Sequence, residues 1–100
     1  MINSQYYQGR LCESNLSYEF FAQPPLVLNL TILANELQDN GIMLDVKTPF
    51  VLIFKMNECR VSLYPSGKLL FKNLNIEEEA KKLFVKFLAI MNRCPSAKAP

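Results

Sequence analysis

The spacing of apolar positions changes along the chain, and each change predicts a different element. Residues 16–22 carry closely spaced aromatic side chains and end at a proline pair, which predicts a first strand. Asn29 can cap a helix through its side-chain oxygen, and Gly41 fits the left-handed position that ends one. Between them an apolar stripe recurs at helical spacing. Its members are Leu30, Leu33, Ala34 and Leu37.

Between residues 43 and 72 the spacing shortens to every second residue, which is typical of strands. In the first extended segment one face carries Phe50, Leu52, Phe54 and Met56, and the other carries Val51, Ile53 and Lys55. Asn57-Glu58 is predicted to turn the chain. Pro65-Ser66-Gly67 predicts a second turn, because proline fixes φ and glycine accepts positive φ. A meander of antiparallel strands follows from these turns.

A second helix is predicted after Asn75, which with Glu78 resembles a capping box. Glutamates 77–79 favour the positive end of the helix dipole. They do not predict a metal site, because three successive helical residues point in different directions. The helix shows an unbroken apolar stripe of Ala80, Leu83, Phe84, Phe87, Leu88 and Met91.

The order β-α-β-β-β-α predicts a single α+β domain over residues 11–93. We expect an antiparallel sheet of about four strands with both helices on one face, since only a sheet offers two amphipathic helices a surface. Residues 1–10 form a lead-in without predicted structure, and residues 94–100 are expected to be a flexible tail. The second face of the sheet, carrying either the Phe50 row or the Val51 row, remains for a partner or a second copy.

Composition favours a small binding module. The chain has 100 residues, half of them hydrophobic and a fifth charged, which excludes a disordered protein. It has no histidine, so the commonest general base and metal ligand is missing, and no nucleotide-binding loop motif occurs. We therefore expect neither enzyme activity nor a cofactor or metal. The net charge of +2 gives little support to nucleic-acid binding.

Three widely spaced cysteines, Cys12, Cys59 and Cys94, form no CxxC pair and no zinc pattern. With no signal-peptide pattern and no apolar run of membrane-spanning length, they predict a reduced cytoplasmic protein with no membrane association. Cys12 follows Arg10 closely, and an exposed thiol there could act as a nucleophile or redox group. An ordinary structural cysteine is the alternative.

Candidate contact residues surround the second turn. Tyr64, Lys68 and Lys72 could form a polar and aromatic contact patch, and a solvated hairpin rim is the alternative.

Five short segments resemble a known family in their order and spacing. They are residues 11–15 (LCESN), 30–41 (LTILANELQDNG), 50–54 (FVLIF), 59–68 (CRVSLYPSGK) and 78–84 (EEAKKLF). The series, over roughly residues 11–88, resembles the C-terminal extension of ThiF/MoeB/HesA-type adenylyltransferases, prokaryotic relatives of ubiquitin-activating E1 enzymes. The adenylation domain is absent, so the resemblance implies an accessory role. The implied partner is an E1-like adenylyltransferase, a ubiquitin-like sulfur carrier or a second copy of the chain.

The positions that carry over to this family are Cys12, Asn15, Tyr64, Pro65, Gly67 and Lys68. Two motifs depart from it: Glu13-Ser14 replaces Gly-Arg, and Ser66-Gly67-Lys68 replaces Asp-Gly-Arg.

Residues 61–70 also resemble part of one half of a TATA-box-binding protein, whose topology is similar to the predicted one. Tyr64 falls where an intercalating phenylalanine would sit, Phe50 lies close to the other, and Lys72 occupies a DNA-facing threonine position. A single half would have to bind duplex DNA as a homodimer. A self-associating structural module is a third alternative. We expect first a protein-interaction domain, with contact residues Cys12, Asn15, Phe50, Tyr64, Lys68 and Lys72.

Overall fold

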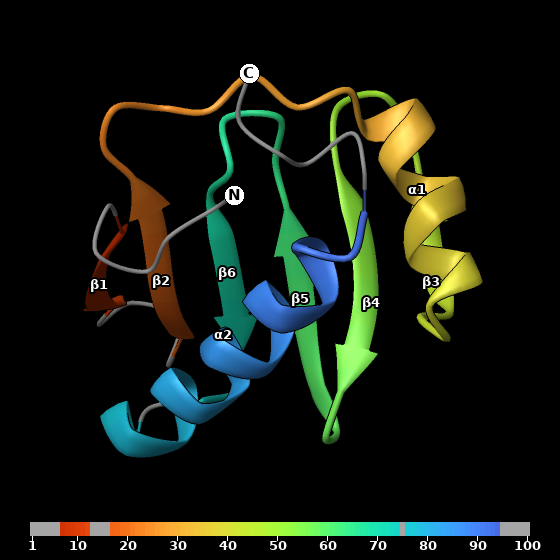
Figure 1. Ribbon diagram of the computed structural model, residues 1–100. Coiled ribbons are helices and arrows are strands. Elements are labelled where there is room, and N and C mark those ends of the chain that lie inside the picture. Colours follow the sequence, from red (N-terminus) through yellow and green to blue (C-terminus); the bar gives the residue numbers. More distant parts are fainter. Residues whose placement is uncertain (1–6, 13–16, 75, 95–100) are drawn as a thin grey trace.

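The computed structural model describes residues 7–12, 17–74 and 76–94, which form an antiparallel sheet and two helices (Figure 1). The strands are β1 (Tyr7–Cys12), β2 (Ser17–Ala22), β3 (Leu44–Lys47), β4 (Leu52–Met56), β5 (Cys59–Leu63) and β6 (Leu69–Lys72), and the helices are α1 (Leu30–Asp39) and α2 (Glu77–Met91). The six strands lie in the order β1-β2-β6-β5-β4-β3, and every neighbouring pair is antiparallel.

The predicted α+β domain with an antiparallel sheet and two helices is confirmed, but the prediction of about four strands is wrong. Both additional strands lie at the edges of the sheet. β1 begins at Tyr7, within the segment 1–10 for which the sequence predicted no structure. Gly9 lets β1 pass beneath an aromatic ring, because a Cβ there would lie 2.7 Å from the Phe20 ring. β3 is short, and a register shift between Leu44 and Val46 interrupts its alternation.

The helix α1 begins and ends where the sequence predicts. The side chain of Asn29 accepts a hydrogen bond from the backbone N–H of Ile32 at 3.2 Å, and Gly41 has φ +89°. The predicted apolar stripe of α1 is buried.

The helix α2 crosses in front of the sheet (Figure 1), and all six residues of its predicted stripe are buried. The ring of Phe87 stacks on Phe54 with centroids 5.3 Å apart. The residue at the N-cap position is Ile76, whose side chain makes no capping hydrogen bond. Asn75, the predicted capping residue, lies outside the described residues.

Both helices pack on the same face of the sheet. Lys47 in β3 donates a hydrogen bond to Asn35 of α1 at 3.0 Å, and Asn40 after α1 contacts the sulfur of Cys94 after α2 at 3.9 Å. Leu52, Phe54 and Met56 point toward the helices and are buried. The row of Val51, Ile53 and Lys55 therefore faces away from the helices. The sequence pattern alone had not decided between this row and that of Phe50. Phe50 precedes β4 and is 77% exposed.

Candidate functional site

The candidate site is the face of the sheet turned away from both helices, which we call the open face. Strand register fixes its middle row as Arg10, Glu19, Leu70, Ser62, Ile53 and Val46. Ile53, Leu70 and Val46 are half-buried although neither described helix covers them. Val46 lies directly opposite Ile53, and the buried Ser62 separates Ile53 from Leu70. Apolar side chains left partly exposed on one surface are typical of contact surfaces.

A buried carboxylate anchors one half of the open face. The side chain of Glu19 is only 8% exposed, and it forms ion pairs with Arg10 at 3.0 Å and Lys68 at 3.3 Å. Burial acts to raise the pKa of Glu19, but the hydrogen bonds and charges of Lys68 and Arg10 outweigh it, and the pKa lies below its ordinary value. Glu19 is therefore ionised at neutral pH and links β2 to Arg10 of β1 and to Lys68, which directly precedes β6.

The same two cations lie over aromatic rings. The guanidinium carbon of Arg10 is 5.3 Å from the centre of the Phe21 ring, and the ammonium of Lys68 is 5.6 Å from the centre of the Tyr64 ring. Each ring therefore has a cation on one side, which limits its use as a free stacking surface.

The other half of the open face carries three cations in a row. Lys72 of β6 is in register with Arg60 of β5, which is in register with Lys55 of β4. We call these three residues the cation ladder, and with strands about 4.8 Å apart it spans about 10 Å. Like charges directly opposite each other destabilise a sheet by a few tenths of a kcal/mol per pair.

The ladder has little counter-charge. Arg60 reaches Asp45 of β3, with a nitrogen–oxygen distance of 3.8 Å and both side chains largely solvated. Lys55 and Lys72 form no ion pair within the part of the chain that the structure describes. The ladder therefore presents positive charge to solvent.

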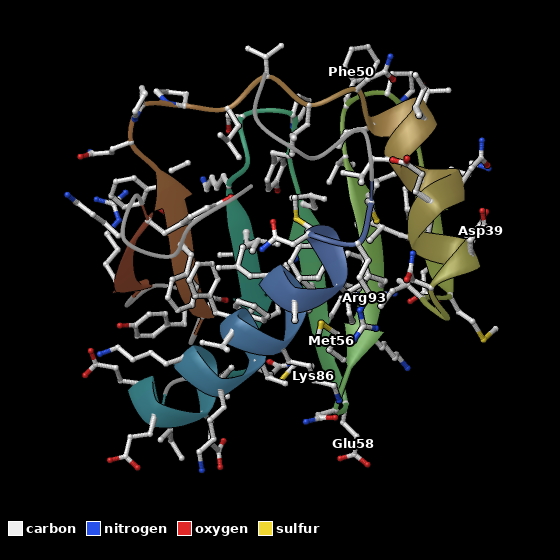
Figure 2. All side chains as sticks on the ribbon, in the orientation of Figure 1. Asp39, Phe50, Met56, Glu58, Lys86 and Arg93 are labelled. Carbon is white, nitrogen blue, oxygen red and sulfur yellow. The ribbon has the colours of Figure 1, made fainter. Side chains whose placement is uncertain are left out.

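The structure brings together only some of the predicted contact residues. Tyr64 and Lys68 are neighbours across the predicted turn, where the N–H of Tyr64 bonds the carbonyl oxygen of Lys68 at 3.0 Å. Lys72 lies at the far end of β6, beside Arg60 and away from that turn. Phe50 lies in the turn before β4, at the opposite end of the sheet from Glu58 (Figure 2).

The remaining two predicted contact residues are described less fully. Cys12 ends β1 in register with Ser17, but its side chain is outside the description. Asn15 lies outside the described residues altogether.

Sequence reasoning missed Glu19, Lys55 and Arg60 as members of a site. Lys55 and Arg60 could have been placed opposite each other from the two-residue turn at Asn57-Glu58. Glu19 could not, because its strand pairs with β6, which follows much later in the sequence.

Cys59 and Cys94 are buried, and their surroundings disfavour the reactive thiolate. Burial, with Glu79 and Glu58 nearby, raises the pKa of Cys59. Burial, with Glu36 and Asp39 nearby, also raises the pKa of Cys94, whose thiol donates to the carbonyl of Ile90 at 3.6 Å. Neither environment favours the nucleophilic thiolate at neutral pH.

A hollow beside β1, β2 and α2 contains two tyrosines. The hydroxyl of Tyr18 donates to Glu77 at 3.3 Å, and that of Tyr7 donates to the carbonyl of Gly67 at 2.8 Å. Burial raises the pKa of Tyr7 to about 12, and burial together with Glu77 raises that of Tyr18. Both phenols therefore stay protonated and serve as hydrogen-bond donors.

No group of three His, Cys, Asp or Glu residues that could hold a metal ion occurs in the described ranges. Within these ranges neither helix has the length and apolar character that crossing a membrane requires. No family model, no curated protein and no solved structure matches the chain.

Proposed function

We propose that the protein is a non-catalytic interaction module that docks a partner protein through the open face of its sheet. The observation that carries this proposal is a sheet face that no described helix or strand covers, on which half-buried apolar side chains lie beside cations. A solvated sheet face ordinarily alternates polar residues outward. Here Leu70 and Ile53, which flank the buried Ser62, and Val46 on the edge strand place apolar side chains beside charged ones, as contact surfaces do.

The resemblance to the C-terminal extension of E1-like adenylyltransferases suggests the first partners to test. They are an E1-like adenylyltransferase and a ubiquitin-like sulfur carrier. In this proposal the protein supplies a docking surface, and any adenylation belongs to the partner.

Duplex DNA is a less suitable occupant of the open face. Minor-groove proteins insert free apolar wedges between bases, whereas the Tyr64 ring has Lys68 over it. Lys68 and Arg10 are themselves bound to Glu19, which leaves fewer cations for phosphate contacts. Pairing of two copies through the open face would oppose two positively charged surfaces, which costs free energy.

Affinity capture with matched variants tests the proposal. Tagged wild-type protein, Ile53→Glu and Val85→Glu are incubated with nuclease-treated lysate of the source cells, and recovered proteins are quantified by mass spectrometry. Ile53 is half-buried on the open face, whereas Val85 is 60% exposed on α2 and serves as the control. Urea unfolding of both variants serves as the control that each variant is folded.

We expect at least one protein to be recovered with wild type and Val85→Glu but lost with Ile53→Glu. Equal recovery with all three proteins, or loss only with Val85→Glu, would contradict docking through the open face. Nucleic-acid-binding proteins recovered from a parallel lysate without nuclease treatment, and from no treated lysate, would favour the DNA alternative. Light scattering of the purified protein tests the self-associating alternative, which requires a dimer mass.

A further inference from the structure

Charge is distributed unevenly over the molecule. Among the described residues, the open face carries two carboxylates, Glu19 and Asp45, and five cations, which are Arg10, Lys55, Arg60, Lys68 and Lys72. Over the rest of the described chain, carboxylates outnumber Lys and Arg residues. Any partner of this face therefore meets a local positive surface that the overall net charge of +2 understates.

The two halves of the open face differ in how much of this charge is available. In the half near β1, the buried carboxylate of Glu19 engages both Arg10 and Lys68. In the cation ladder, Arg60 has a single long contact with Asp45, and Lys55 and Lys72 have no ion-pair partner among the described residues. The ladder is therefore where an incoming anionic group would gain most.

We infer that the cation ladder of Lys55, Arg60 and Lys72 binds an acidic segment of the partner protein, an inference that rests on the proposed docking function. Three cations on adjacent strands form a row about 10 Å long, which two or three neighbouring carboxylates can match. The apolar side chains of Ile53 and Leu70 lie two residue pairs along the strands from this row, which is the next position on the same face. An acidic segment with adjacent apolar residues therefore fits both features.

An acidic protein segment fits better than nucleic acid. The row of available cations is only about 10 Å long, and beyond it Arg10 and Lys68 are engaged by Glu19, so a long line of phosphates would find few further contacts. Lys68 also occupies one side of the Tyr64 ring on which a base would stack.

The ladder can be tested without knowledge of the partner. Uniformly ¹⁵N-labelled protein is titrated with a decaglutamate peptide, and in a second arm with a 12-base-pair DNA duplex at the same ionic strength. The variants are Lys55→Glu/Lys72→Glu and, as a control with the same change in net charge, Lys82→Glu/Lys86→Glu on α2. The first of these, which we call the ladder variant, should remain folded, because it replaces three positive charges by a row in which negative and positive charges alternate.

With decaglutamate we expect amide shifts concentrated around residues 55, 60 and 72. We expect affinity to fall about tenfold in the ladder variant, and by less than twofold in the α2 variant. Equal shifts around the α2 lysines, unchanged affinity in the ladder variant, or tighter binding of the duplex through the same residues would each overturn the inference.

The capture experiment separates this inference from the proposed function. Recovery that is lost with Ile53→Glu but retained with the ladder variant would overturn the inference and leave the proposed function standing. Decaglutamate binding at the ladder together with recovery that is indifferent to Ile53→Glu would instead overturn the proposed function.

Discussion

The buried carboxylate of Glu19 offers the sharpest quantitative prediction for the open face. Glu19→Gln keeps the shape of the side chain and removes its charge. The amide oxygen can still accept a hydrogen bond from one of the two cations, whereas the amide nitrogen faces the other and cannot accept. A hydrogen bond to a charged group contributes about 1.5–3 kcal/mol when it is fully buried. Here the cations are 68% and 41% exposed, and solvent screening brings each interaction toward the value for a surface pair, up to about 1 kcal/mol. We expect a net loss of about 1–2 kcal/mol in the free energy of unfolding at pH 7.

The loss should depend on pH in a defined direction. The pKa of Glu19 in the folded protein lies below its ordinary value of 4.5, which applies to the unfolded chain. The stabilisation by the ionised carboxylate is therefore fully present above about pH 4.5 and disappears as pH falls through the folded-state pKa. The difference between wild type and Glu19→Gln should be constant near neutral pH and should close in acid.

Urea unfolding followed by circular dichroism between pH 3 and pH 7 measures this difference. Glu58→Gln is the matched control, because Glu58 is exposed in a turn, and its change should stay within about 0.5 kcal/mol. A Glu19→Gln variant as stable as wild type at pH 7, or a deficit that persists unchanged at pH 3, would refute the assignment of Glu19 as an ionised anchor.

Three further predictions concern the core, the first helix and the buried thiols. Phe87→Ala should lower the free energy of unfolding by about 3–5 kcal/mol in urea, since Phe87 is fully buried against Phe54; a loss below 1 kcal/mol would contradict the packing. Asn29→Ala should cost about 1 kcal/mol in the same assay by removing the N-cap bond, whereas no change would show that the bond is not formed. Cys59 and Cys94 should react slowly with a disulfide reagent in the folded protein and rapidly in urea, as mapped by mass spectrometry; fast labelling of either without denaturant would contradict its burial.

Local patterns predicted the helices because a helix is made of contacts between nearby residues. The stripes of α1 and α2 could be identified residue by residue, and so could the turns at Asn57-Glu58 and before Gly67, where positive φ is observed. The edge strands β1 and β3 were missed because their own alternation of apolar and polar residues is weak, although each pairs with the next strand along the chain.

Patterns between residues close in sequence likewise predicted only part of the candidate site. Tyr64 and Lys68 could be predicted as neighbours because one short turn joins their strands. Lys72 was grouped with them by its nearness in sequence, but strand direction carries it to Arg60 at the other end of β6. The ladder emerges only when the registers of β4, β5 and β6 are combined, and the Glu19 anchor only when β2 pairs with β6.

Methyl cross-saturation tests the docking surface most directly. Wild-type protein with labelled Ile, Leu and Val methyl groups is mixed with the unlabelled partner recovered by capture, and the partner's protons are saturated. The methyl signals of Ile53, Leu70 and Val46 on the open face should lose intensity, while that of Val85 on α2 should not. Loss confined to Val85 and the exposed methyl groups of Val27 and Ile32, with the open-face signals unchanged, would contradict the account.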